Sequence, residues 1–322
     1  MGLLAVLALG LAGCGSSSGA GRLKAISLAL DFTPNPAHAP IYVAVGRGYD
    51  RRFGVRISIL VPGSGPDTLD LLTSHRAEIG VLDIDDLALA RLRGVDVVGI
   101  AALVQRPLSA IIAQPYVHRP RDLDGKRVGV SGLPSDPAFL KALITDDGGD
   151  WKTVKPITIG FNAVAQMAAG NVAGVPAFWS DEGVALRLRG IAVNEFRIER
   201  YGAPVYPEVL FVALRSTLQR DRQSVIRTLA AIALGARTAV ADPSLATSVI
   251  VRAVGAGDRR LIAAQTHVLG PALLPPLTLQ RTVLERFSAF EARSGLLPAP
   301  FDVSRAFDFS LAPAALKLAG PG

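Results

Sequence analysis

The chain of 322 residues contains one cysteine, Cys14, and only four histidines. A single cysteine excludes an internal disulfide, so packing alone must stabilise the fold. The histidines are far apart in the sequence and have no cysteines near them, which argues against a metal site. They are His38, His75, His118 and His267. We therefore expect no metal, and no cofactor is indicated.

Motifs of catalysis and of nucleotide binding are also missing. Gly129–Gly132 lacks the second glycine of a nucleophile elbow, and Gly63–Gly65 lacks the third glycine of a dinucleotide fingerprint. Asp83, Asp85 and Asp86 are not followed by the Gly/Glu pattern of a calcium loop. Helix capping and favourable charge in a first helical turn explain them better. These absences favour a binding protein over an enzyme.

The basic residues do not gather into runs, although the net charge is +7. No run of five basic residues occurs, and no aromatic residues interleave with them, so we expect no nucleic-acid partner. A solvated outer surface explains the charges. Beyond the N-terminus, no uncharged apolar run reaches the about 18 residues of a membrane span.

The first residues are typical of an export signal. Residues 1–13 are uncharged and mostly apolar, and no Lys or Arg precedes them. The sequence Leu11-Ala12-Gly13-Cys14 resembles a bacterial lipoprotein box, and a Ser/Gly run follows. We expect a signal peptide over 1–13 and a flexible tether over 14–21, lipidated at Cys14. The protein would be exported and anchored to the cell membrane, facing the periplasm or the cell exterior. The alternative is a signal peptide that is cleaved without lipidation.

Strand-like and helix-like segments alternate along much of the chain, which predicts an α/β fold with mostly parallel sheets. The predicted strands are 26–30, 55–61, 79–81, 97–104, 109–113, 127–130, 157–159, 175–178 and 209–214. Helices are predicted near 135–147, 163–169 and 182–190, and from 221 almost to the end.

The segment Leu28–Gly54 is the most informative one. It predicts a strand, then a polar and aromatic loop, then a helix, and ligands of open α/β sheets bind at such places. Asp31 can accept hydrogen bonds from an amino group, Phe32 can face a planar ring, and Asn35 can donate and accept. His38 could also contact a ligand. The alternatives are a structural turn carboxylate for Asp31 and a loop histidine bonded to backbone for His38.

This segment resembles the first strand–loop–helix of the periplasmic solute-binding proteins for thiamine-pyrimidine precursors, a family related to yeast thiamine-pyrimidine synthase. The resemblance rests on Asp31-Phe32, Pro34, Asn35, His38 and Pro40, then Arg47-Gly48-Tyr49 and Gly54. A second match is Phe178–Gly183, which is similar to the family pattern Y/F-W-x-x-E-G. The resemblance covers roughly 24–240.

The resemblance implies a two-lobed periplasmic binding protein of type II, each lobe a mostly parallel sheet flanked by helices. Lobe one would combine 22–112 with 209–322 and carry a helical C-terminal segment. Lobe two would be 113–208. The chain would cross between the lobes near 109–115 and 205–212, and the cleft would close on a ligand.

The resemblance also implies site residues in lobe two. Glu182 would accept the exocyclic amine of an aminopyrimidine, and Trp179 would be a stacking wall. Charge-assisted hydrogen bonds and indole stacking suit these roles. The alternative is a helix N-terminal glutamate beside a buried tryptophan. Further ligand-binding candidates follow other strands or precede the second crossing, and capping explains Asp67 equally well. They are Ser64, Asp67, Ser135, Asn162 and Tyr206.

We therefore predict a monomeric solute-binding lipoprotein of an ABC importer. It would capture a small planar heterocycle, most simply a thiamine-related aminopyrimidine, by lobe closure and deliver it to permease subunits. The same fold could instead bind a sulfonate, nitrate, riboflavin or another aromatic solute. Sulfonate and nitrate should need an Arg-rich or Ser/Thr-rich anion pocket. A pyrimidine synthase-like enzyme is disfavoured because no cysteine cluster exists and no lysine is near His38 in the sequence.

Overall fold

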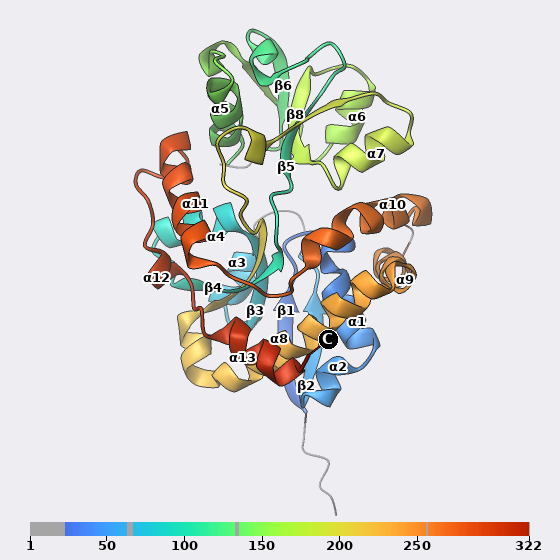
Figure 1. Ribbon diagram of the computed structural model, residues 1–322, viewed down its shortest axis with the longest axis vertical. Coiled ribbons are helices and arrows are strands. Elements are labelled where there is room, and N and C mark those ends of the chain that lie inside the picture. Colours follow the sequence, from blue (N-terminus) through green and yellow to red (C-terminus); the bar gives the residue numbers. More distant parts are fainter. Residues whose placement is uncertain (1–22, 63–66, 133–134, 256, 322) are drawn as a thin grey trace, which may run out of the picture.

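The computed structural model describes residues 23–62, 67–132, 135–255 and 257–321. The predicted leader over 1–13, the tether with Cys14, and Ser64 lie outside these residues. The lipid anchor and the ligand role of Ser64 therefore stay predictions. Two lobes, joined by two chain segments, make up the molecule (Figure 1).

The sheet of the first lobe has the strand order β2-β1-β3-β10-β4. Its strands are β1 (Lys24–Ala29), β2 (Val55–Leu60), β3 (Ile79–Asp83), β4 (Val97–Val104) and β10 (Val209–Leu214). Strand β1 pairs in parallel with β2 and β3, whereas β10 is antiparallel to both β3 and β4. Apolar side chains alternate into the core along β1 and β2, and β4 is buried along its whole length.

The sheet of the second lobe repeats this arrangement in the order β7-β6-β8-β5-β9. Its strands are β5 (Ser109–Ala113), β6 (Arg127–Val130), β7 (Lys155–Thr158), β8 (Gly174–Phe178) and β9 (Asn194–Arg197). Strand β6 is parallel to β7 and β8, and β5 is antiparallel to β8 and β9. Each sheet thus has one reversed strand in its fourth place, and the predicted two-lobed type II fold is confirmed.

The first crossing lies earlier than predicted. Strand β5 belongs to the second sheet, so the chain leaves lobe one within 105–108, before the predicted boundary at 112. The return crossing lies within 201–208, before β10, whereas the prediction placed it near 205–212. Residues 97–113 form an almost continuous buried apolar stretch, and only the pairing partners show that it enters two different sheets. Strand β9 was missed because its sequence is mostly polar.

Helices flank both sheets (Figure 1). The helices of lobe one are α1 (Ala39–Gly46), α2 (Tyr49–Arg52), α3 (Asp67–Thr73), α4 (Ile84–Leu92), α8 (Arg215–Ala241), α9 (Pro243–Val254), α10 (Arg259–Leu269), α11 (Arg281–Ser294), α12 (Val303–Ala306) and α13 (Leu311–Ala319). Those of lobe two are α5 (Asp136–Asp146), α6 (Ala163–Ala168) and α7 (Glu182–Leu188). Short 3-10 helices are η1 (Pro36–His38), η2 (Pro120–Leu123), η3 (Trp151–Thr153), η4 (Ile198–Arg200) and η5 (Gly270–Leu273). In Figure 1, α10 extends toward α7 and α11 lies beside α5.

Helix α8 is the central helix of lobe one. Among the described residues it alone is long and apolar enough to cross a membrane, yet 61% of its most apolar stretch is buried in the fold. It packs against α1 and α13. A Cβ atom on Gly235 would lie 2.0 Å from the carbonyl oxygen of Pro40, so glycine permits the close approach of α8 to α1. The backbone of Asp221 departs from helical geometry and marks a kink.

Candidate functional site

The loop after β1 is fixed by a hydrogen-bonded triad. The Nε2 atom of fully buried His38 lies 2.6 Å from Oδ1 of Asp31, and Nδ1 accepts the backbone N–H of Asn35 at 3.1 Å. Because Nδ1 is an acceptor, the ring hydrogen is on Nε2 and is donated to Asp31. The Oδ1 atom of Asn35 caps η1 by accepting the N–H of Ala37 at 2.9 Å. His38 and Asn35 therefore act by positioning Asp31, whose carboxylate remains partly exposed.

Two exposed aromatic rings meet across the lobes. Phe32 follows β1 and is 41% exposed, and Phe161 follows β7 and is 62% exposed. Their ring centroids lie 5.3 Å apart with the planes tilted by 54°. Asn162 beside them is exposed and its Nδ2 donates to the carbonyl of Ile159 at 3.3 Å, so its ligand role stays a prediction. Phe161, and not its neighbour Asn162, therefore lies opposite Phe32.

Two adjacent carboxyl groups begin helix α7. The Oε2 atom of Glu182 accepts the N–H of Phe178 at 3.0 Å. Burial and the neighbouring Asp181 raise the pKa of Glu182 to about 7. Asp181 accepts a hydrogen bond from Gln265 of α10, so this bond joins lobe two to lobe one. Burial also raises the pKa of Asp181. No sequence pattern pointed to Gln265, because its partner is 84 residues away.

Trp179 is engaged in packing beside the crossings. Its ring is 7% exposed, and its Nε1 donates to the carbonyl of Pro107 at 3.0 Å. The guanidinium of Arg197 lies 4.0 Å from the ring centroid and covers one face. This geometry matches the alternative interpretation, a buried tryptophan beside a helix N-terminal glutamate. A stacking face turned toward a solute stays a prediction.

Tyr206 lies within the second crossing. It is 1% exposed, its ring centroid is 4.3 Å from that of Phe287, and its hydroxyl hydrogen-bonds Glu208. This burial leaves no ring surface open to a solute. An aromatic side chain just before a crossing can face the interior as readily as the space between the lobes, and the sequence does not distinguish the two. Ser135 is partly buried and makes no side-chain capping bond at α5. Asp67 is described only by its backbone at the start of α3. For these two residues the ligand role stays a prediction.

A cluster of buried and partly buried carboxyl groups lies near Asp31, and sequence reasoning assigned none of them to it. Its members are Asp83, Asp85, Asp86, Glu208 and Glu291. Glu208 joins the two crossings, because it accepts the N–H of Leu108 at 2.7 Å and of Ser109 at 3.2 Å, and the Ser109 hydroxyl at 3.0 Å.

Burial raises the pKa of each of these carboxyl groups, and repulsion from neighbouring carboxylates adds to the rise for all but Glu208. The pKa of Asp86 is raised to about 6 and that of Glu291 to about 8, mainly by burial. Asp85 and Asp86 lie in the first turn of α4, as predicted. Asp83 precedes that helix but makes no capping bond, so the capping prediction is wrong for it. Its Oδ1 atom is buried without a hydrogen-bond partner among the described residues.

The raised pKa of Glu291 predicts a stability effect of pH. Its folded pKa of about 8 exceeds the ordinary value of 4.5, so the folded state holds a proton that the unfolded state has lost. Stability therefore falls as pH rises from about 4.5 to about 8. Glu291→Gln keeps the shape of the side chain but cannot ionise. When the pH rises from 5 to 8.5, its unfolding free energy should therefore fall by about 1–3 kcal/mol less than that of the wild type. Urea unfolding at both pH values measures this. Exposed Glu285 on the same helix provides the control, Glu285→Gln, and equal pH dependence in all three proteins would contradict the prediction.

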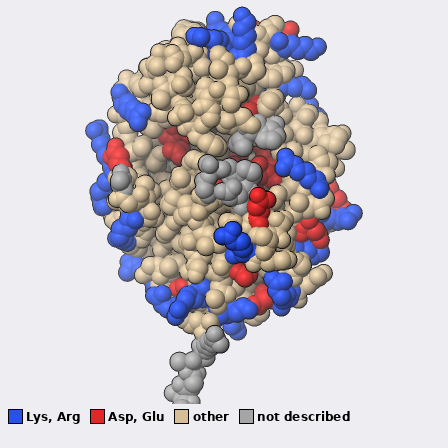
Figure 2. All heavy atoms as spheres, turned by 180° about the vertical axis from the view of Figure 1, so that it is seen from behind, with Lys and Arg blue, Asp and Glu red and all other residues tan. Residues whose placement is uncertain are grey.

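Acidic side chains lie beside the junction of the lobes on one face of the molecule (Figure 2). Figure 2 shows Asp and Glu side chains beside the junction of the lobes, whereas Lys and Arg are spread over the outer surface. Repulsion from Asp31 helps to raise the pKa of both Asp83 and Asp86, which places the three carboxyl groups close together at the ends of β1 and β3. Among the described residues, no group of His, Cys, Asp and Glu has the arrangement to hold a metal ion.

The family model described as NMT1/THI5 like matches residues 35–246. The chain belongs to this family. The formylaminopyrimidine-binding protein of Halalkalibacterium halodurans is 27% identical to this NMT1/THI5-like chain over 252 residues, which are 77% of the chain and 76% of that relative.

Several solved structures with the same fold are periplasmic binding proteins. The alkanesulfonate-binding protein SsuA from Xanthomonas axonopodis pv. citri, bound to MOPS, superposes with a TM-score of 0.70 at 18% identity, covering 89% of this NMT1/THI5-like chain and 99% of SsuA. The nitrate-binding protein NrtA from Synechocystis PCC 6803 gives a TM-score of 0.73 at 12% identity, covering 92% and 89%. At these identities the similarity shows the fold alone.

Proposed function

We propose that the protein binds a small planar heterocycle with an amino group, most simply a thiamine-related aminopyrimidine, between its lobes. The observation that carries the proposal is the Phe32–Phe161 contact across the lobes, with both rings exposed. A flat solute would enter when the lobes separate and replace this ring–ring contact by two ring–solute contacts. The role is binding without catalysis, like that named for the formylaminopyrimidine-binding relative.

One carboxyl group from each lobe supports an amine-bearing solute. Asp31 adjoins Phe32, and Glu182 begins the helix after β8 in the opposite lobe. A carboxylate accepts amine N–H donors in charge-assisted hydrogen bonds. An anionic solute would instead meet repulsion from the partly exposed carboxylate of Asp31.

The cellular setting is part of the same proposal. We infer that the chain is exported, anchored to the membrane by lipid on Cys14, and delivers its solute as a monomer to the permease of an ABC importer. The lipoprotein-like tetrapeptide before the Ser/Gly run supports the anchor. Metabolic labelling with a palmitate analogue should mark the wild type and not Cys14→Ser. Labelling of both proteins, or of neither, would contradict the anchor.

Calorimetry with a panel of solutes tests the binding proposal. Formylaminopyrimidine should bind ligand-free protein with a dissociation constant in the micromolar range or tighter, about −8 kcal/mol. An alkanesulfonate and nitrate, named for the two structural neighbours, should give no heat of binding at the same concentrations. Binding of either anion without the aminopyrimidine would replace the proposal by that alternative.

A further inference from the structure

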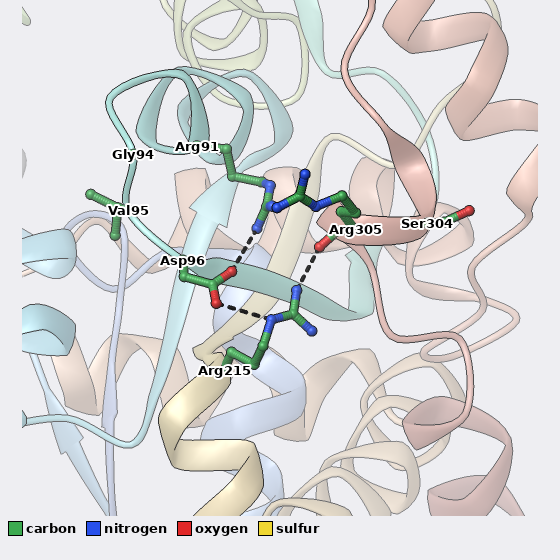
Figure 3. A pocket seen from close by; sticks show the side chains of 7 residues that line it. All are labelled: Arg91, Gly94, Val95, Asp96, Arg215, Ser304 and Arg305. Atoms are coloured by element: carbon green, nitrogen blue, oxygen red, sulfur yellow. Dashed lines mark hydrogen bonds and ion pairs between the residues drawn. The ribbon is translucent and has the colours of Figure 1, made fainter.

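A second polar hollow lies on lobe one, away from the proposed solute site. It has a volume of about 360 Å³ and is lined by Arg91, Gly94, Val95, Asp96, Arg215, Ser304 and Arg305. Figure 3 shows three arginine side chains, from α4, α8 and α12, converging on this hollow. The hollow adjoins the start of β4, and the first crossing begins after the end of this strand. Because β4 has eight residues, its two ends, and so the hollow and the crossing, are about 25 Å apart.

Two of the three guanidinium groups are held in place by the fold. Arg91 donates to the carbonyl of Val97 at 2.6 Å, and Arg215 donates to the carbonyl of Arg305 at 2.7 Å. Side chains already restrained in this way lose little further conformational freedom when they bind a ligand.

One carboxylate, that of Asp96, is part of the lining of the hollow. Oδ1 of Asp96 lies 3.3 Å from Arg91, and Oδ2 lies 3.0 Å from Nε of Arg215. These two arginines lower the pKa of Asp96 by hydrogen bonds and charge. Asp96 offsets only one of three positive charges, and among the described residues the exposed Arg305 guanidinium has no carboxylate or carbonyl partner. The geometry therefore leaves about two positive charges facing a solvent-filled concavity.

We propose that this hollow binds a phosphate group, with Arg305 as its principal free donor and Arg91 and Arg215 as the fixed ones. A guanidinium presents paired N–H donors that match phosphate oxygens. A doubly charged anion would balance the charge that Asp96 leaves. The phosphate could belong to a free ion or to the headgroup of an anionic lipid, and both share this chemistry. The proposal does not depend on the identity of the solute between the lobes.

Arg305→Ala in the full chain is the decisive variant, because its guanidinium makes no contact whose loss would unfold the protein. Arg189→Ala removes an exposed arginine from lobe two and is the matched control. Inorganic phosphate, titrated by calorimetry against chloride of equal ionic strength, should bind the wild type and Arg189→Ala equally. Arg305→Ala should bind about tenfold more weakly, the effect of losing one charge-assisted hydrogen bond.

Sedimentation with vesicles separates the two sources of phosphate. Capture by phosphatidylglycerol vesicles but not phosphatidylcholine vesicles, reduced in Arg305→Ala and competed by phosphate, would assign the headgroup. Phosphate binding without vesicle capture would assign the free ion. The proposal is overturned if phosphate gives no heat beyond that of chloride, or if Arg189→Ala weakens binding as much as Arg305→Ala does.

Discussion

Replacing Phe161 or Phe32 by alanine should weaken binding of formylaminopyrimidine by roughly 5- to 150-fold, the range expected for losing a 1–3 kcal/mol stacking contact. The two rings come from different lobes and lie 5.3 Å apart, so each supplies one face of the proposed site. Because both rings are exposed, their removal leaves no cavity in a core, and the unfolding free energy should change little. Calorimetry on each variant and on the double variant measures the loss.

Tyr116 provides a matched control, since it is an aromatic residue of lobe two with 57% exposure. Tyr116→Ala should bind the aminopyrimidine as the wild type does. If Phe32→Ala and Phe161→Ala both keep wild-type affinity, the rings are not the walls of the site, and the proposed position of the solute is wrong.

Replacing Glu182 by glutamine should both weaken binding and remove its dependence on pH. The pKa of Glu182 is about 7, and only the ionised form accepts two amine N–H donors. In the wild type, affinity should therefore fall roughly tenfold for each pH unit below 7. At pH 8, Glu182→Gln should bind about 10- to 100-fold more weakly, because it loses a charge-assisted hydrogen bond. Calorimetry between pH 5.5 and 8 measures both effects.

The exposed Glu285 again gives the control, because Glu285→Gln should keep the wild-type pH profile. A Glu182→Gln variant whose affinity still rises through pH 7 would assign the titration to another group. Asp86, with a pKa of about 6, would then be the next carboxyl group to test.

Much of the fold could be predicted from the sequence because its signals are local. The alternating apolar residues of β1 and β2, and the turn residues between elements, predict strands and helices without any long-range information. Asp31 became a candidate because it closely follows the first strand, whereas Glu182 was implied by the family resemblance, and the ligand roles of both stay predictions. The assignment of β5 to the second sheet could not be predicted, because β8 and β9, the strands that pair with β5, are distant from it in sequence.

The direction in which a side chain faces could not be predicted from the sequence. Trp179 and Tyr206 occupy positions near the junction of the lobes, but packing against Arg197 and Phe287 directs them inward. Phe161 lies opposite Phe32 because of the relative orientation of the two lobes, and no local sequence pattern encodes that orientation. The carboxyl groups around Glu208 likewise come from three separate chain segments.

A crystal structure of the protein with formylaminopyrimidine tests the central claim most directly. We predict that the pyrimidine ring lies between Phe32 and Phe161, with its amino group within hydrogen-bonding distance of Glu182 or Asp31. A ring bound elsewhere, or an anion held by arginines between the lobes, would contradict the account.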